Sequence, residues 1–446
     1  MTTLSAIQRK TIERRAVDAG TWGMPILSVH AMRRAYLEDA GAEYNDIVYW
    51  SKLADWKNQT TTPNSSSYYV YVNFNTSDGP VVLDIPRPVG AGLFGTILDA
   101  WQLGAGEWGT ALGDTNAIKY LILPPGYDGD VPEGYTVARP QTYNGFSLIR
   151  SIPLNMSEQA VADALALVKQ LKVYPLSEAG NPAPQRFIDM AGRLFDGIVH
   201  WDENVYADLA QILNEEPVLE QDRTFMGLIK AIGIEKGKEF APSAEVQEIL
   251  AETAKEAHQW LMDSLLDFSA PVWKSETSWR LPGQAVIPET ASTFQRSGYL
   301  DVDARSLGFF SFYALPMKLG PGTYYFSTFE DSDGNRLRGE ETYRLRVPAN
   351  VPAKQFWSLE LYDVETCGFI KDMPHTGLDS FADLEYNEDG SVDLYIGPKA
   401  PEARESNWAP TSPGRMWFPY FRFYGPDPAF FEDVESWKLP EFEHIG

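Results

Sequence analysis

The chain has 446 residues, a formal net charge of −25, a single cysteine and 13% aromatic residues. A chain of this length is longer than a single domain with one hydrophobic core, so we expect two or three domains. Its composition, with 44% apolar and 22% charged residues, is typical of a globular protein. One cysteine excludes an intramolecular disulfide framework and a cysteine-based zinc site. The acidic excess disfavours binding to nucleic acid or to anionic lipid.

The N-terminal residues contain no apolar stretch of secretory length, because charges arrive at Arg9 and Lys10. Nowhere do about 18 apolar residues follow one another, so we expect no helix that spans a bilayer. These features favour a soluble, cytoplasmic protein without membrane contact, although a secreted form trimmed of its signal peptide would have the same appearance.

Residues 1–60 are expected to hold the N-terminal helices. Apolar residues at helical spacing predict one helix over 6–20, which should end before Pro25, and a second helix over 26–38.

From Tyr68 the apolar period changes to two, and Tyr69 and Tyr71 alternate with valines as in a half-buried strand. Four segments have this character: 68–74, 81–85, 118–123 and 146–152. Turn residues separate them, so residues 61–154 are expected to form a small β-sandwich.

Residues 155–270 are expected to form a helical domain. Its clearest pattern lies between Ser243 and Phe268, where apolar residues recur at three- and four-residue steps. Weaker patterns predict further helices over 157–171, 185–196, 203–215 and 221–235.

Residues 271–446 return to strand patterns. Six segments separated by turn residues are strand candidates: 309–313, 323–326, 343–347, 356–362, 392–396 and 417–424. Such a run predicts a jelly-roll sandwich. The expected fold class is therefore a mainly β, multidomain α+β chain, whose exposed strand edges would permit a homo-oligomer.

Two motifs in the N-terminal half match a family pattern. Gly23-Met24-Pro25 stands where that pattern has Gly-Tyr-Pro, and Thr62-Pro63-Asn64 followed by Tyr69 resembles Thr-Pro-Asn-Asn-Asp-Thr-Leu-Tyr. Ser65-Ser66-Ser67 replaces Asn-Asp-Thr, so any role of the pattern's Asp carboxylate is not carried over.

The C-terminal half carries three more such motifs. Asp331 to Gly339 resembles Asp-x-Asp-Gly-x-x-Leu-x-Gly, Phe356 to Asp363 resembles Phe-Trp-Ser-Leu-Thr-x-Tyr-Asp, and the segments beginning at Glu405 and Arg422 resemble the closing signature. In this order they resemble a bacterial and giant-virus family that pairs the domains of unknown function 1254 (N-terminal) and 1214 (C-terminal). The resemblance implies a small immunoglobulin-like sandwich, a helical domain and a jelly roll, and it supplies no catalytic residue or cofactor.

The segment around Asn407 is the main site candidate. Glu405, Asn407 and Trp408 place a carboxylate, an amide and a large ring within one turn of chain, which suits a polar ligand held against an aromatic face. Trp408 would form an apolar platform with Trp357 and Tyr362 if the strands bring them together. The structural alternative is that Asn407 holds a turn and Trp408 closes one end of a sandwich.

Two weaker patterns have simpler explanations. Asp331 and Asp333 beside Gly334 resemble the start of a calcium loop, but the bidentate Glu is missing, and a hairpin turn explains Asp-Gly equally well. The Gly-x-Gly-x-x-Gly spacing over 90–95 lacks the helix and the acid of a dinucleotide site, so we interpret it as a glycine-rich turn and expect no cofactor.

Two functions follow from these residues. The first is a small-molecule or carbohydrate hydrolase with a pocket between the β domains, in which Glu405 is the acid or base and Asn64 and Asn407 orient polar groups. The stacking aromatic residues would be Tyr69, Trp357, Tyr362 and Trp408. The second is a non-enzymatic ligand-binding or self-assembling protein, in which the same residues close the sandwiches.

Overall fold

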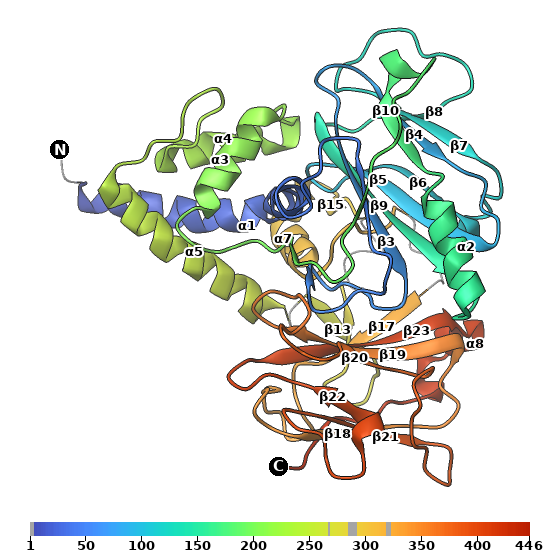
Figure 1. Ribbon diagram of the computed structural model, residues 1–446. Helices are drawn as coiled ribbons and strands as arrows, with labels where there is room; N and C mark the ends of the chain where they lie inside the picture. Colours follow the sequence, from blue (N-terminus) through green and yellow to red (C-terminus); the bar gives the residue numbers. More distant parts are fainter. Residues whose placement is uncertain (1–3, 266–267, 284–291, 318–322) are drawn as a thin grey trace. The chain divides into compact units, whose positions relative to one another are not determined.

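The computed structural model describes residues 4–265, 268–283, 292–317 and 323–446 and divides the chain into two compact units. The N-terminal unit comprises Met1–Ala54, Ser66–Asp263 and Ser292–Met317, and the C-terminal unit comprises Asp55–Ser65, Ser264–Ala291 and Lys318–Gly446. Helices and strands are mixed, and most regular elements are strands in several sheets (Figure 1). The short segment Asp55–Ser65 therefore belongs to the unit formed mainly by the distant C-terminal half of the chain.

The N-terminal unit contains a six-stranded sheet of order β11-β1-β3-β9-β5-β6 and a four-stranded sheet of order β10-β4-β7-β8. Valines, isoleucines and leucines of both sheets share one apolar core. Ala164 and Leu167 of helix α2 (Glu158–Val168) pack into the same core. The strands are β1 (Ile47–Tyr49), β3 (Tyr68–Asn75), β4 (Val81–Ile85), β5 (Ala91–Asp99), β6 (Gly104–Gly109), β7 (Ile118–Ile122), β8 (Thr136–Ala138), β9 (Asn144–Pro153), β10 (Lys172–Pro175), β11 (Phe187–Asp189), β12 (Phe195–Asp196), β15 (Gln295–Arg296) and β16 (Tyr299–Leu300).

Helices form a second core in this unit, made mainly by the apolar faces of α1, α3 and α5. Ser157 caps α2 as expected, because its hydroxyl accepts the Ala160 N–H. The helices are α1 (Ala6–Leu37), α2 (Glu158–Val168), α3 (Val205–Glu215), α4 (Arg223–Ile229), α5 (Ala244–Ser264) and α7 (Val302–Ser311), with 3-10 turns η1 (Thr110–Leu112), η2 (Leu176–Glu178), η3 (Glu220–Asp222) and η4 (Lys230–Ile232).

Helix α1 is continuous, so the predicted break before Pro25 is wrong. A proline has no N–H to donate to the carbonyl four residues earlier, which here is that of Thr21. The Thr21 carbonyl instead accepts a hydrogen bond from the hydroxyl of Ser306 in α7. Because a neighbouring helix satisfies the freed acceptor, the helix passes through the proline.

Three other local predictions are corrected. The predicted strand 309–313 lies largely in α7, where every residue from Ala304 to Ser311 is buried, so burial in this helix does not follow a 3.6-residue period. The predicted helix 185–196 holds two short strands, β11 and β12. The glycine-rich segment 90–95, predicted as a turn, forms the first part of strand β5 from Ala91 on, and a Cβ at Gly95 would lie 2.2 Å from the Trp108 ring.

Strand β3 is buried on both faces, whereas the alternation predicted burial on one. Val70 and Val72 enter the core between the sheets, and Tyr69 and Tyr71 pack in a cluster with residues of α1. The Tyr71 ring meets that of Tyr36 edge-on, with centroids 5.9 Å apart. Helix α1 covers the face of β3 that carries the tyrosines. The alternation within the strand does not indicate that a helix packs on this face.

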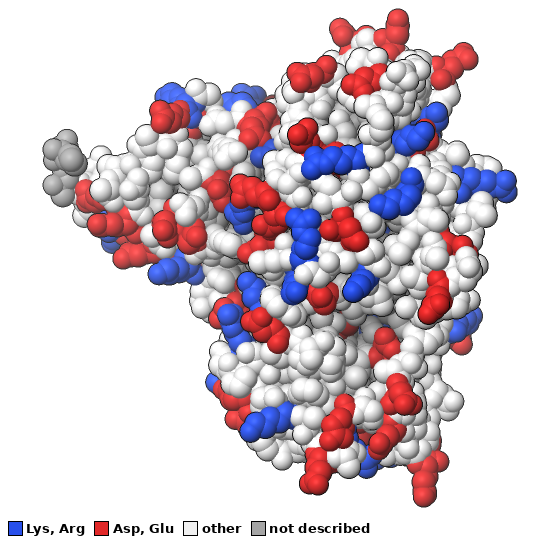
Figure 2. All heavy atoms as spheres, in the orientation of Figure 1, with Lys and Arg blue, Asp and Glu red and all other residues white. Residues whose placement is uncertain are grey.

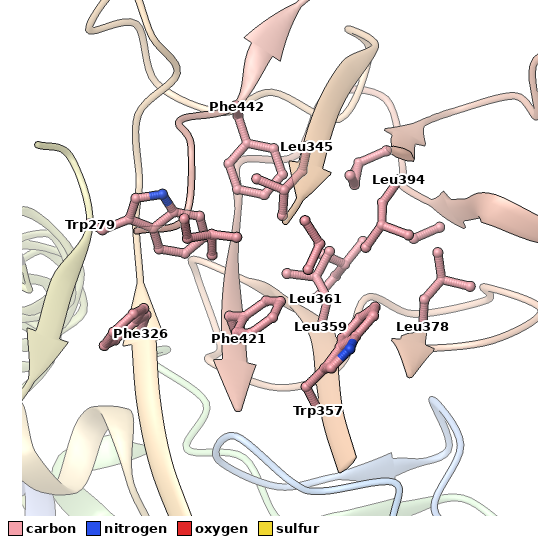
Figure 3. Packing of buried hydrophobic residues seen from close by; sticks show 14 of the residues in the cluster. Trp279, Phe326, Leu345, Trp357, Leu359, Leu361, Leu378, Leu394, Phe421 and Phe442 are labelled. Carbon is pink, nitrogen blue, oxygen red and sulfur yellow. The ribbon is translucent and has the colours of Figure 1, made fainter. Parts of the chain in front are cut away.

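The C-terminal unit also has two sheets, of order β13-β14-β17-β23-β19-β20 and β22-β21-β18-β24. Figure 3 shows the core between them, where Phe326, Leu359 and Phe421 of the first sheet face Leu345 and Leu394 of the second. The elements are β2 (Asn58–Gln59), β13 (Ser269–Pro271), β14 (Arg280–Pro282), β17 (Thr323–Ser327), β18 (Tyr343–Val347), β19 (Ala353–Asp363), β20 (Gly377–Asp379), β21 (Val392–Gly397), η5 (Glu405–Asn407), β22 (Trp408–Pro410), β23 (Trp417–Pro426), α8 (Pro428–Glu432), η6 (Val434–Ser436) and β24 (Glu443–His444).

Acidic and basic side chains are interspersed on the face that Figure 2 shows, with no large field of a single sign. None of the helices in the described part of the chain has both the length and the apolarity needed to cross a bilayer.

Asp99 at the end of β5 provides a pH-dependent test of this core. The residue is fully buried, and burial raises the pKa of its carboxyl to about 7 although backbone N–H groups of Leu103 and Trp101 favour the ionised form. Because its folded pKa lies above its unfolded value, its contribution to stability is present at low pH and is lost as the pH rises towards 7.

We predict that Asp99→Asn becomes more stable relative to the native chain between pH 5 and pH 8, by on the order of 2 kcal/mol. Thermal unfolding across that range measures the difference. Asp389→Asn is the matched control, since Asp389 is exposed and its side-chain hydrogen bond from Ser391 lowers its pKa to about 2. A pH-independent difference for Asp99→Asn would contradict the prediction.

Candidate functional site

The face of the six-stranded sheet that points away from the C-terminal core is polar and aromatic. Along β19 and β23 the odd-numbered residues Trp357, Leu359, Leu361, Phe421 and Phe423 lie in the core, so the even-numbered residues occupy the opposite face. This second face carries Ser358, Glu360 and Tyr362 on β19, Tyr420, Arg422 and Tyr424 on β23, Tyr325 and Ser327 on β17, and Arg280 on β14.

Glu360 and Arg422 form a buried ion pair at the middle of this face. Their side chains are 2% and 3% exposed, and Arg422 Nη1 contacts Glu360 Oε2 directly. Arg422 Nη1 also donates to the Tyr362 hydroxyl at 2.6 Å, and that hydroxyl lies 3.0 Å from Glu360 Oε2. Two charges removed from water in this way require nearly complete hydrogen bonding.

Tyrosine rings surround the guanidinium. Its central carbon lies 5.2 Å from the ring centroids of Tyr325 and Tyr420 and 5.4 Å from that of Tyr362, which suits cation–π contact in a desolvated site. Burial raises the pKa of Tyr420 well above its ordinary value, so this phenol stays neutral near neutral pH.

Residues 59–65, here called the strap, complete the site. The Pro63 carbonyl accepts the Tyr362 hydroxyl at 2.6 Å, and Asn64 Nδ2 donates to the Tyr424 hydroxyl at 2.6 Å. Ser65 donates to Glu360 Oε1 through its N–H at 2.7 Å and its hydroxyl at 2.5 Å. The strap thus satisfies the oxygen of Glu360 that faces away from Arg422.

Backbone strain marks the place where the strap meets the loop after β19. Thr62 has a φ of 39° and Cys367 a φ of 51°, both in the left-handed region that β-branched and other non-glycine residues rarely adopt. The two meet directly, because the Thr62 N–H donates to the Cys367 carbonyl at 2.6 Å. Strained residues tend to persist where surrounding contacts hold them, often at functional positions. Burial raises the pKa of the Cys367 thiol well above its ordinary value, so it is a poor nucleophile.

Four polar atoms on this face have no hydrogen-bond partner among the described residues. They are Arg422 Nε, Ser358 Oγ, Ser327 Oγ and Arg280 Nε, all buried. Ser358 lies directly opposite Arg422 in the register of β19 and β23, and Ser327 lies directly opposite Arg280 in that of β17 and β14. The atoms therefore form two cross-strand Ser–Arg pairs, which we call the Ser–Arg pairs below.

Two of the residues predicted from sequence belong to this site. Asn64 and Tyr362 come together through the strap, on which Asn64 lies next to the carbonyl that Tyr362 binds. Trp357 lies on the other face of the same strand as Tyr362 and stacks on Phe421 in the core, with ring centroids 5.4 Å apart. Tyr69 lies in the N-terminal unit, where Arg150 packs over its ring.

The predicted Glu405–Trp408 segment lies at the start of the four-stranded sheet. Asn407 is buried, and its amide binds the backbone of Glu385 and Asp393, so it holds the turn. Trp408 donates from Nε1 to the Gly397 carbonyl at 2.9 Å, and Glu405 is exposed. The structure therefore does not bring these residues to Asn64 and Tyr362.

The Asp331–Asp333 loop has the contacts of a hairpin turn. Asp331 Oδ1 accepts the N–H groups of Asp333 and Asn335, each at 2.9 Å, and Gly334 has a φ of 80°. Within the described residues, no group of three or more His, Cys, Asp or Glu side chains is placed to hold a metal ion.

Sequence reasoning missed Glu360 and Arg422, although both lie in segments that it singled out. The period-two alternation of β19 would have placed Glu360 on one face with Ser358 and Tyr362. Glu360 stands where the resembled family pattern has Thr, and Ser65 stands where it has Asn. These two departures from the pattern are in direct contact, which accounts for Ser65 in structural terms.

We predict that Glu360→Gln lowers the free energy of unfolding by about 3–5 kcal/mol, because it leaves Arg422 buried without its counter-charge. Chemical denaturation of the full chain measures this loss. Glu443→Gln is the matched control: Glu443 pairs with Arg344, but their side chains are 53% and 40% exposed, so about 1 kcal/mol or less is expected. Equal losses for the two variants would contradict a special role of the buried pair.

Comparison with solved structures shows a similar fold. The VPA0106 protein from Vibrio parahaemolyticus aligns over 98% of this chain and 100% of its own, with 17% identity and a TM-score of 0.54. An uncharacterized protein from Burkholderia cenocepacia aligns over 98% of this chain and 94% of its own, with 13% identity and a TM-score of 0.42, which is too low to carry an argument. No curated protein matches the chain significantly.

Two family models match the chain, both described as proteins of unknown function. DUF1254 matches residues 44–175 and DUF1214 matches residues 322–428, and this order is the one that the sequence motifs predicted. The chain therefore belongs to the family in which a DUF1254 domain is followed by a DUF1214 domain.

Proposed function

We propose that the C-terminal unit binds a small polar molecule on the second face of its six-stranded sheet. The observation that supports this proposal is the set of four buried, unpartnered polar atoms in the Ser–Arg pairs. Buried polar groups are nearly always hydrogen-bonded in folded proteins, and leaving one unsatisfied costs about 1–3 kcal/mol. Four such atoms on neighbouring positions of one face are best explained by a guest that completes them.

The same geometry favours binding over hydrolysis. A carboxyl group acts as a general acid or base only if it can exchange a proton with the substrate, but the carboxylate of Glu360 is occupied by contacts with Ser65, Tyr362 and Arg422. Glu405 is exposed and lies in the turn η5, which precedes strand β22 of the other sheet. Ligand binding without turnover, one of the two functions expected from the sequence, is therefore the function that we propose, and hydrolysis stays a prediction.

The proposal also includes finer points of fold and setting. We infer that the two sheets of the N-terminal unit form an immunoglobulin-like sandwich and those of the C-terminal unit a jelly roll. A cytoplasmic location and a homo-oligomer stay predictions that fractionation and sedimentation would test.

We predict that Ser327→Ala and Ser358→Ala each raise the free energy of unfolding of the ligand-free chain by about 1 kcal/mol, because each removes a buried hydroxyl without a partner. Ser147→Ala and Ser151→Ala are matched controls on buried strand positions, where the hydroxyls donate to the carbonyls of Thr96 and Ala164. These controls should lower stability by about 1 kcal/mol. Chemical denaturation of the four variants distinguishes the two kinds of serine.

Binding itself is tested by thermal unfolding of the full chain with a panel of neutral sugars, polyols, carboxylates and phosphates. A ligand of the folded chain raises the melting temperature in a concentration-dependent way. We expect at least one class to do so, with the shift lost in the Ser327→Ala/Ser358→Ala double variant and kept in Ser147→Ala. No response to any class, or a shift that survives in the double variant, would contradict the proposal.

A further inference from the structure

We propose that the molecule bound at the Ser–Arg pairs is a small oxyanion, a carboxylate or a phosphate, and this inference rests on the proposed function. It concerns the kind of chemical group that the unpartnered atoms of Ser327, Ser358, Arg280 and Arg422 can hold.

The sheet register places the two pairs close together. Tyr325 of β17 lies opposite Arg422, and Ser327 lies two residues further along β17, opposite Tyr420. Ser327 and Arg422 are therefore diagonal neighbours on the same face, a relation in which side chains are roughly 7–8 Å apart at the backbone and remain within reach of long side chains. A single small molecule can thus contact Ser327 of one pair and Arg422 of the other.

The hydrogen-bonding groups left without partners favour a ligand that is rich in acceptors. The Nε–H groups of Arg280 and Arg422 can only donate, and the two serine hydroxyls can donate as well. The remaining nitrogens of Arg422 are already used, since Nη1 binds Glu360 and Tyr362 and Nη2 donates to the Thr62 carbonyl at 3.4 Å. Each of the four unpartnered atoms of the Ser–Arg pairs can therefore donate a hydrogen bond, and a carboxylate or phosphate matches such donors with its several oxygens.

A neutral sugar suits these unpartnered groups less well. Each sugar hydroxyl brings a donor that needs an acceptor, and both oxygens of Glu360 are engaged. The Asp379 carboxylate, at the β20 end of the row of Ser358 and Arg422, accepts the N–H groups of Phe381 and Ala382. A sugar hydroxyl beside Arg422 would therefore find both oxygens of Glu360 occupied, which costs affinity.

The charges on this face allow a small anion and disfavour a large one. Glu360 offsets Arg422, while the guanidinium of Arg280 on β14 adds a positive charge beside Ser327, several strands away from the Asp379 carboxylate on β20. In a buried site such charge-assisted hydrogen bonds act at short range and with little screening. The net charge of −25 repels polyanions from the chain as a whole, so a compact oxyanion is favoured over a nucleic acid.

Isothermal titration of the full chain with inorganic phosphate, with acetate and with glucose tests the inference. We expect one of the two anions to bind and glucose not to bind, and the anion that binds identifies the source as a phosphate or a carboxylate. Arg280→Gln and the Ser327→Ala/Ser358→Ala double variant should each weaken that binding at least about tenfold. Arg336→Gln, which removes an exposed arginine of the same unit, should leave it within about twofold.

Each contrary result has a separate meaning. If glucose binds and neither anion does, the inference of an oxyanion ligand is wrong, whereas the proposed binding of a small polar molecule is supported. Anion binding that Arg336→Gln weakens as much as Arg280→Gln does would show a general surface effect and would also overturn the inference. If none of the three probes binds, the inference of an oxyanion ligand is wrong. The proposed function is also wrong only if the Ser327→Ala/Ser358→Ala double variant is less stable than the native chain.

Discussion

The buried pair of Glu360 and Arg422 is the interaction on which the rest of the C-terminal site depends. Two charges with almost no exposure remain in place only when each is fully paired and hydrogen-bonded, and the sheet alone does not supply enough partners. The strap supplies further partners: Ser65 donates twice to Glu360, and the Thr62 carbonyl accepts from Arg422, whose Nε still has no partner among the described residues. The ion pair therefore explains why a segment that precedes the DUF1214 match by more than 250 residues belongs to the same compact unit.

That dependence also gives the strap its unusual backbone. Thr62 adopts a left-handed conformation that costs about 1–3 kcal/mol for a non-glycine residue, and its N–H is fixed to the carbonyl of Cys367, which has the same kind of φ. The hydrogen bonds of Pro63 and Asn64 to Tyr362 and Tyr424 hold the chain in this state. The Thr-Pro-Asn motif thus lies within the DUF1254 match but packs as part of the C-terminal unit.

The sequence predicted local structure well where one strand or helix explains its own pattern. Strand β4 was predicted with its observed bounds, and β18 likewise, because alternation and flanking turns are local signals. Predictions failed where a residue or element distant in the sequence determines the local structure. The predicted break before Pro25 is absent because Ser306 satisfies the carbonyl that this proline frees in α1. The predicted strand 309–313 lies largely in α7, because this helix is buried along most of its length. The candidate site followed the same rule. Asn64 and Tyr362 were predicted, whereas the pairing of Glu360 with Arg422 needs a strand register that no local pattern contains.

Hydrogen exchange at the strap tests the central claim most directly, since it reports whether the backbone is held by the ion pair. The amides of Thr62 and Ser65 should exchange as slowly as those of β23 in the native chain, and Glu360→Gln should accelerate Ser65 far more than the strands of the N-terminal unit. Glu443→Gln should leave both amides protected. Rapid exchange of Thr62 and Ser65 in the native chain, at the rate of an exposed loop, would contradict the account.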